Sequence, residues 1–238
     1  MLTPSAGDRI SLKRLLVATD FSSPSEIALS HALAIARRYR SRIYLAHVTP
    51  PELYKSVPGE FLKEAMERAR EHAQHEISHI IRVHGLGTLR HRILQEEGNI
   101  SDVLLQLVKK HSIDLLVIGT RGHRGVKRLL LGSVAEKIFR QATCPVLIVP
   151  PSAGERSRIA RILYPTDFSQ HSLAAVPYAF SLARHHRAKL ILLHVVERAG
   201  DSLADLNRQR KLIENRSRRS VLRRVVLEHK PVFEGEFG

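Results

Sequence analysis

Short apolar runs and longer amphipathic stretches alternate along the first 150 residues. The runs are rich in leucine and β-branched residues, and they predict strands at 14–19, 42–48, 89–95, 114–119 and 146–149. The stretches between them carry apolar residues at helical spacing and predict helices at about 24–40, 59–83, 100–111 and 133–141. Alternation of this kind is typical of βαβ units. We therefore expect a three-layer α/β sandwich around a five-stranded parallel sheet.

The opening segment of this plan occurs twice. The sequence RLLVATDFS at 14–22 aligns without a gap with RILYPTDFS at 161–169, and the register holds to His47 against His194. We expect a complete domain at 1–150, a linker with Pro, Ser and Gly at 151–157, and a truncated second domain at 158–238. In the second domain, we predict a strand at 161–166, a helix at 171–187, a strand at 189–195 and a long basic helix at 203–228.

The composition is that of a folded protein in a reducing compartment. Apolar residues make up 43% of the chain and charged residues 26%, an ordinary globular mixture. Cys144 is the single cysteine, and the sequence shows neither a signal-peptide pattern nor an apolar run of membrane-spanning length. We expect a cytoplasmic protein without a membrane partner, in which Cys144 is a small buried residue.

The net charge of +15 raises the question of a polyanionic partner. Lysine and arginine are densest between residues 208 and 224. This segment predicts the solvated face of an amphipathic helix or, alternatively, a site for nucleic acid, although it has no groove-reading motif and no stacking aromatic residues. A metal site is a further alternative, because His72, His75 and His79 share one predicted helix face. No carboxylate is arranged beside them, so solvent-exposed histidines are the simpler interpretation.

The most informative segment joins a predicted strand to a predicted helix. Gly119, Gly122 and Gly132, followed by Ser133, have the spacing Gly-x2-Gly-x9-Gly-Ser. Glycine after a parallel strand permits positive φ and close backbone approach, and a helix start offers free N–H groups to an anion. This pattern predicts a polyphosphate site. The alternative is that Ser133 and Glu136 form a capping box that only stabilises the helix.

Three short motifs accompany the glycine loop. They are Thr-Asp-Phe-Ser at 19–22, His-Val at 47–48 and Ala-Thr-Cys-Pro-Val-Leu-Ile-Val at 142–149. With the loop, they make residues 10–150 resemble the universal stress protein family, and the loop spacing is that of its ATP-binding branch. The resemblance implies the strand order 3-2-1-4-5 of the adenine nucleotide alpha hydrolase-like fold. It also implies a homodimer through the fifth strand at 146–149.

The resemblance further implies that ATP, with or without Mg²⁺, binds where the strand order reverses. Residues at the strand tips would contact the adenosine, and residues of the loop and helix start would hold the phosphates. The implied nucleotide-binding residues are Ala18, Thr19, Asp20, Val48, Ile118, Gly119, Arg121, Gly122, Arg124, Gly132, Ser133 and Val134. For Asp20, the alternative is a turn residue that accepts backbone hydrogen bonds. The second domain has no glycine loop, which implies one nucleotide per chain.

These features favour a nucleotide-dependent binding module in stress signalling, with a protein partner that the sequence does not identify. Apart from Asp20, no acidic residue lies near the loop to act as a base or to hold a metal, so we expect no catalytic residue. Two alternative functions stay open. One is slow ATP hydrolysis, and the other is polyanion binding by the arginine-rich segment at 208–224.

Overall fold

The computed structural model describes residues 10–120, 132–154, 159–195 and 222–228 of the chain. The chain forms two compact units. The first unit spans Ser11–Ser157, and the second comprises Arg158–Gly238 together with the first ten residues. No helix in the described ranges is long and apolar enough to cross a membrane.

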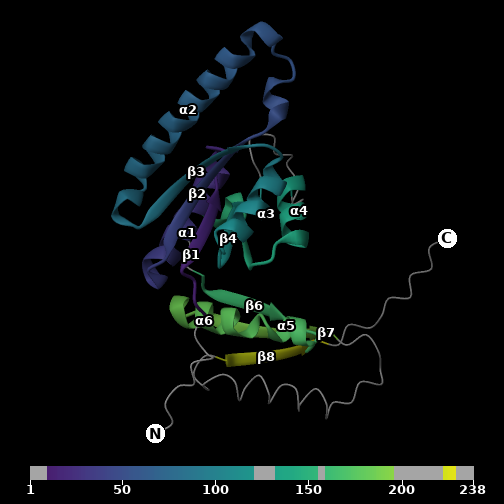
Figure 1. Cartoon of the computed structure of the whole chain (residues 1–238). Helices are drawn as coiled ribbons and strands as arrows, with labels where there is room; N and C mark the ends of the chain where they lie inside the picture. The colour runs from purple at the N-terminus through teal and green to yellow at the C-terminus, as the bar shows by residue number, and fades with distance from the viewer. Residues whose placement is uncertain (1–9, 121–131, 155–158, 196–221, 229–238) are drawn as a thin grey trace, which may run out of the picture. The chain divides into compact units, whose positions relative to one another are not determined.

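Five parallel strands form the sheet of the first unit, in the order β3-β2-β1-β4-β5 (Figure 1). They are β1 (Arg14–Ala18), β2 (Arg42–Thr49), β3 (His91–Glu97), β4 (Leu115–Gly119) and β5 (Val146–Val149). The predicted fold class and strand order are confirmed. The central residues of β1 and β4 are buried because helices cover both sheet faces, which explains why these strands are continuously apolar rather than alternating.

Four α-helices and four short 3₁₀ helices of the described part complete the first unit. The α-helices are α1 (Ser23–Tyr39), α2 (Leu62–Val83), α3 (Ile100–Lys110) and α4 (Ser133–Gln141). The 3₁₀ helices are η2 (Pro51–Tyr54), η3 (Gly59–Phe61), η4 (Leu86–Thr88) and η5 (Pro151–Ala153). Helices α1 and α2 lie on one face of the sheet, and α3 and α4 lie on the other (Figure 1).

The core on the α3 and α4 face holds much of this arrangement together. Leu16, Leu104 and Ile138 are fully buried there, and burial of one such side chain contributes about 1.5–3 kcal/mol. Cys144 is half-buried rather than fully buried as expected, it packs against the same cluster, and burial raises the pKa of its thiol. The single cysteine therefore acts as a small apolar residue.

The second unit has a three-stranded parallel sheet in the order β6-β7-β8. Its described elements are β6 (Arg161–Pro165), α5 (Gln170–Leu173), α6 (Val176–His186), β7 (Lys189–Val195) and β8 (Leu222–Glu228). The single helix predicted at 171–187 is divided into α5 and α6. Pro177 explains the division, because proline has no backbone N–H and is tolerated only at the start of a helix.

The long basic helix predicted at 203–228 is wrong over its last seven residues. These residues form β8, which pairs in parallel with β7 and places Val225 beside Leu192. Two adjacent β-branched residues, Val225 and Val226, favour a strand. A strand at 222–228 also forms backbone hydrogen bonds with the free edge of β7, which a helix at this place would leave unpaired. Residues 203–221 of the predicted helix lie outside the described residues.

Candidate functional site

The motif at 19–22 builds the turn that leads from β1 into α1. The backbone of Phe21 is left-handed, with φ at 63°. Its N–H donates to Thr19 Oγ1 over 3.1 Å, and the Ser22 N–H donates to Asp20 Oδ1 over 3.1 Å. The Ser22 hydroxyl then caps α1 by accepting from the Ser25 N–H. Asp20 therefore accepts a backbone hydrogen bond, as the alternative interpretation of this residue expected.

His47 of β2 supports this turn from below. Its Nδ1 lies 3.0 Å from the carbonyl oxygen of Thr19, and Nδ1 must carry the proton because a carbonyl only accepts. The imidazole also stacks on Phe21, with ring centroids 4.4 Å apart. Burial lowers the pKa of His47 and outweighs the Thr19 hydrogen bond and the Asp20 charge, which raise it. The residue is thus a neutral structural partner of the turn near pH 7.

The same construction recurs in the second unit. Phe168 has φ at 60°, and its N–H donates to Thr166 Oγ1 over 2.9 Å. His194 Nδ1 lies 2.7 Å from the Thr166 carbonyl oxygen, and its ring is 4.7 Å from that of Phe168. Hydrogen bonds, first of all from Ser172, hold the pKa of Asp167 well below its ordinary value. The repeated sequence is therefore also a repeated local structure.

A pocket of about 400 Å³ opens between the turn after β1 and helix α2. It is lined by Asp20, Phe21 and His47 on one side and by His72 and Glu76 on the other. No described residue of the glycine loop lines this pocket. Within the described ranges, no group of three or more His, Cys, Asp or Glu residues is arranged to hold a metal ion.

A second pocket, of about 250 Å³, lies at the starts of α3 and α4. Its lining residues are Pro50, Glu52, Asn99, Ile100, Ser101, Ser133, Val134 and Lys137. The two helix starts differ. Asn99 caps α3 by accepting from the Asp102 N–H over 3.3 Å, whereas α4 begins at Gly132 without a side-chain cap. The first N–H groups of α4 therefore keep the capacity to bind an anion.

The capping-box interpretation of Ser133 is wrong. The N-cap position belongs to Gly132, and Ser133 is the first residue inside the helix. Glu136 does not reach back to the helix start but accepts from Arg140 Nη2 over 3.1 Å. The exposed Ser133 side chain lines the pocket instead.

The two described glycines of the loop permit close backbone approach rather than positive φ. A Cβ at Gly119 would lie 3.0 Å from the Pro24 carbonyl oxygen, and one at Gly132 would lie 3.2 Å from the Thr120 oxygen. Neither glycine has a positive φ, so of the two properties that glycine permits here, the structure uses close approach. Gly119 brings the end of β4 against the start of α1, and Gly132 brings the start of α4 against the chain after β4.

The structure divides the sequence-predicted site residues into groups. Ala18, Val48, Ile118 and Val134 pack in the cluster on the α3 and α4 face, with Val48 and Ile118 buried. The Thr19 side chain is buried and hydrogen-bonded to Ser25, and Asp20 lines the pocket beside α2. Arg121, Gly122 and Arg124 lie outside the described residues.

Sequence reasoning missed four polar residues of the pocket at α4. They are Glu52, Asn99, Ser101 and Lys137. One signal could have found Asn99 and Ser101, because every strand-to-helix junction of a parallel sheet lies at the same edge. Lys137 is an additional positive charge at this pocket, and its Nζ is paired with Asp102 Oδ1 at 2.7 Å.

Comparisons with known proteins support one family for both units. A profile described as the universal stress protein family matches residues 11–150 and 158–226. Universal stress protein MJ0531 of Methanocaldococcus jannaschii is 30% identical over 138 residues, which are 58% of this chain and 81% of that protein. A universal stress protein of Mycolicibacterium smegmatis is 30% identical over 197 residues, which cover 79% of this chain and 65% of that protein.

Solved structures agree with this relationship. Protein MJ0577 of Methanocaldococcus jannaschii is 26% identical, with a TM-score of 0.55 over 59% of this chain and 97% of that one. A universal stress protein of Archaeoglobus fulgidus has a TM-score of 0.69 over 93% of this chain and 80% of that one, and its 21% identity limits the likeness to the fold. On the sequence match of both units, the chain belongs to the universal stress protein family.

Proposed function

We propose that the first unit binds ATP or a related adenine nucleotide, one per chain, with the phosphates at the start of α4. In this proposal, the protein is a cytoplasmic nucleotide-dependent binding module of stress signalling. Nucleotide occupancy would stabilise one conformation or assembly of the chain, and a protein partner would recognise that state. Pairing of two copies through β5, an edge strand of the sheet, belongs to the same proposal.

The observation that carries the proposal is the uncapped start of α4 beside a pocket. A helix start has four backbone N–H groups without helical partners and an effective charge of about +0.5. The pocket lies at the carboxyl edge of the sheet, where the connections from β1 and β4 run in opposite directions, and such crevices bind ligands. The spacing of Gly119, Gly122 and Gly132 supports a polyphosphate as the ligand of this pocket.

Binding without rapid turnover is favoured by the positions of the carboxylates. Asp20 lines the pocket beside α2 and does not line the pocket at Ser133, although Pro50 lines both. Glu52 is the one acidic residue that lines the pocket at α4 among the described residues. Catalysis of phosphoryl transfer needs a positioned base and metal-holding carboxylates together. If Mg²⁺ accompanies the nucleotide, Glu52 is the described residue placed to contact it, and slow hydrolysis through Glu52 is the second candidate function.

A charge introduced at Ser133 tests the proposal without disturbing the fold. A carboxylate in the first helical turn stabilises a helix by about 0.3–1 kcal/mol, but it repels phosphate at the same place. The chain is purified without added nucleotide and denatured, and the released compounds are identified by mass spectrometry. We expect about one adenine nucleotide per wild-type chain, as much in Ser133→Gln, and almost none in Ser133→Glu.

Thermal unfolding with added ATP provides the second measurement. Saturation at about 100 times the dissociation constant stabilises a folded protein by about 2.7 kcal/mol. We expect this stabilisation in the wild type and in Ser133→Gln, and not in Ser133→Glu. The proposal fails if Ser133→Glu retains nucleotide as the wild type does. It also fails if the wild type neither releases nucleotide nor is stabilised by ATP.

A further inference from the structure

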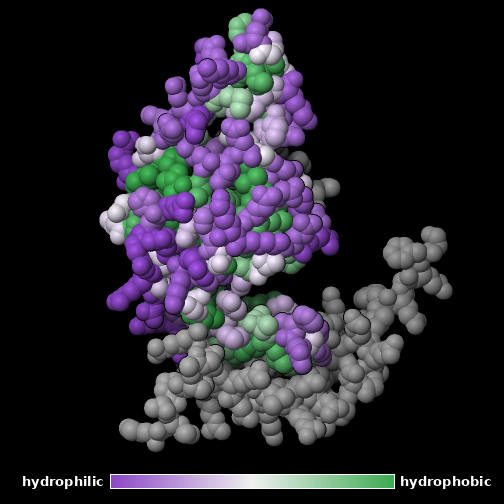
Figure 2. Space-filling model, in the orientation of Figure 1, coloured by the Kyte–Doolittle hydropathy of each residue, from purple (hydrophilic) through white to green (hydrophobic). Residues whose placement is uncertain are grey.

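Basic side chains gather at the edge of the first sheet that lies opposite the proposed nucleotide site. In a parallel α/β unit, the strands begin and the helices end at this edge. It consists of the segments 10–14, 37–42, 82–92, 109–114 and 141–146. These segments contain eleven Lys and Arg residues and a single acidic residue, Asp114. In Figure 2, the lower left of the first unit, where α1 ends (Figure 1), is coloured mainly as hydrophilic.

Ten of the eleven cations are exposed, and we name them together the amino-edge surface. They are Lys13, Arg37, Arg38, Arg40, Arg42, Arg82, Arg90, Arg92, Lys109 and Lys110. Backbone hydrogen bonds show that the surface is continuous across the strands. The Arg42 N–H donates to the Lys13 carbonyl over 2.7 Å, and the Ile43 N–H donates to the Arg90 carbonyl over 2.9 Å. Neighbouring strands of this kind are about 4.8 Å apart.

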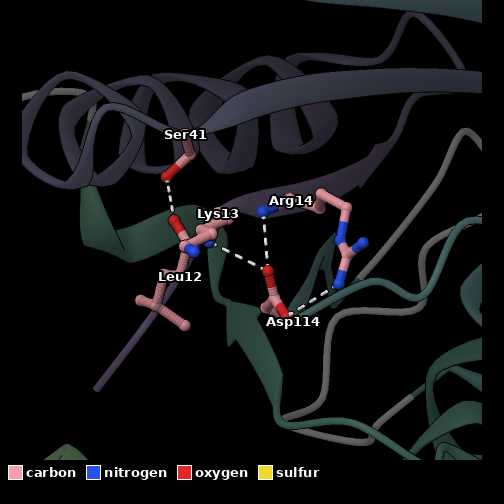
Figure 3. A network of polar contacts seen from close by, with 5 residues as sticks. All are labelled: Leu12, Lys13, Arg14, Ser41 and Asp114. Carbon is pink, nitrogen blue, oxygen red and sulfur yellow. Dashed lines mark hydrogen bonds and ion pairs between the residues drawn. The ribbon is translucent and has the colours of Figure 1, made fainter. Parts of the chain in front are cut away.

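The one acidic residue at this edge is used internally. Asp114 Oδ2 accepts the backbone N–H groups of Lys13 over 2.9 Å and of Arg14 over 2.8 Å (Figure 3). Its Oδ1 lies 3.6 Å from Arg14 Nη2, which pairs the two charges. In the same view, the Ser41 hydroxyl donates to the Leu12 carbonyl and ties the start of β2 to the start of β1. Asp114 and Arg14 therefore cancel, and no ion pair within the described part of the chain involves the other ten cations.

Compensation of helix dipoles explains only a part of this charge. Arg37 Nη2 donates to the His84 carbonyl over 3.4 Å, and Arg90 Nη2 donates to the Arg40 carbonyl over 2.9 Å, so both satisfy oxygens where a helix ends. Each helix end carries about −0.5 charge, and α1, α2, α3 and α4 end at this edge. Four such ends leave about +8 of the ten charges uncompensated.

The side chain of His111 lies close to two cations of the amino-edge surface and is affected by their charge. Its ring stacks on Tyr44 with centroids 5.0 Å apart, and its buried Nε2 has no hydrogen-bond partner. Burial lowers the pKa of His111, the charges of Arg92 and Lys110 lower it further, and the charge of Glu96 opposes them. Two cations of the amino-edge surface therefore both disfavour the protonated form of the His111 imidazole, as expected where like charges lie close together.

We propose that the amino-edge surface binds the sugar–phosphate backbone of double-stranded nucleic acid without reading its sequence. Seven of the ten cations are arginines, whose guanidinium groups fit phosphate with two hydrogen bonds. The sheet and its two helix layers give the surface a width of about 20 Å. A duplex carries about 12 phosphates over that length. Charge and extent therefore match a duplex backbone.

Two other polyanions fit the surface less well. Binding of single strands relies on aromatic side chains that stack on bases, and the only Phe, Tyr or Trp of these segments is the half-buried Tyr39. Binding to an anionic membrane relies on apolar side chains that insert, and Val83 is the one large apolar side chain of these segments that is strongly exposed. The surface is independent of the nucleotide site and stands or falls separately from the function proposed above.

The test measures how binding of the full chain to a duplex depends on salt. Fluorescence anisotropy follows a labelled duplex of about 20 base pairs and arbitrary sequence between about 50 and 200 mM KCl. We expect the logarithm of affinity to fall with the logarithm of salt concentration with a slope of about −4 to −7, for about five to eight phosphate contacts. Arg42→Ala/Arg92→Ala/Lys110→Ala should reduce the magnitude of this slope by about 2 to 3.

A matched variant removes the same charge from another exposed surface of the first unit. Lys55, Lys63 and Arg68 lie in or near the start of α2, each within 4.0 Å of a glutamate. Their triple alanine variant should keep the wild-type slope. The proposal is overturned if both variants lose the same affinity for the duplex. It is also overturned if neither variant loses affinity while a third variant, Arg216→Ala/Arg218→Ala/Arg219→Ala, does. It is equally overturned if the wild type binds vesicles with anionic lipid but not the duplex.

Discussion

The close approach of β4 to the start of α1 makes Gly119→Ala a direct test of why glycine stands at this position. A Cβ at residue 119 would lie 3.0 Å from the Pro24 oxygen and 3.2 Å from the Pro24 carbonyl carbon. These atoms belong to the backbone at the start of α1, so they cannot move aside as a flexible side chain would. Overpacking of this kind costs about 1–3 kcal/mol. For a unit of this size, 1 kcal/mol corresponds to about 3–4 °C, so Tm should fall by about 3–12 °C.

Two other glycines provide matched controls for this substitution. A Cβ at Gly59 or Gly87 would meet no atom within 4 Å, and neither residue has a positive φ. Alanine at these positions reduces the entropy of the unfolded chain and should leave the free energy of unfolding equal or raise it by up to about 1 kcal/mol. Circular dichroism melting of the three variants gives the comparison. If Gly119→Ala melts with the controls, the steric account of Gly119 is wrong.

Two further predictions follow from the turn after β1 and from the pocket at α4. The pKa of His47 is lower in the folded chain than its ordinary value of 6.5, so the unfolded chain binds more protons and stability should fall as the pH falls through about 6.5. In His47→Gln, melting should depend less on pH, and His75→Gln on the exposed side of α2 should match the wild type. Any slow ATP hydrolysis should be lost in Glu52→Gln and kept in Asp20→Asn, whose amide oxygen can still accept the Ser22 N–H. Loss of turnover in Asp20→Asn but not in Glu52→Gln would place the reacting phosphate near Asp20 rather than in the pocket at α4.

The sequence was sufficient for the fold of the first unit because several local signals agreed there. The limits of α4, β5 and β7 are those that the apolar pattern predicted. Helix and strand signals conflicted at 222–228, where basic residues at helical spacing also contain two adjacent valines. Pairing with β7 decided in favour of the strand, and such long-range pairing cannot be read from a local pattern.

The candidate site was predictable in its place along the chain but not in its division between two sheet faces. Ala18 and Asp20 are two residues apart, yet Ala18 packs toward α3 and α4 while Asp20 lines the pocket beside α2. Strand β1 ends at Ala18, so the alternation of side-chain directions along the strand no longer applies at Asp20. Glu52 was missed because it comes from another segment of the chain, which only the folded unit brings to this pocket. Lys137 lies one turn after Ser133 on α4, so helical spacing could have found it.

Parallel topology separates the two proposed sites along the strands, and this separation predicts how they interact. Strand β1 has five residues and is about 16 Å long, and the side chains and loops at its ends bring bound phosphates to about 25 Å from a bound duplex. In water, each pair of like charges at that distance repels by about 0.17 kcal/mol before screening.

Salt decides whether this repulsion is measurable. At about 0.15 M salt, the separation is about three screening lengths, so about four nucleotide charges and six duplex phosphates repel by about 0.2 kcal/mol in total. ATP should then change the dissociation constant of the duplex by less than about twofold. At about 0.01 M salt, the same charges should weaken duplex binding about tenfold or more. A change above about fivefold at 0.15 M would exceed what the charges supply, and it would mean that nucleotide binding alters the conformation of the amino-edge surface.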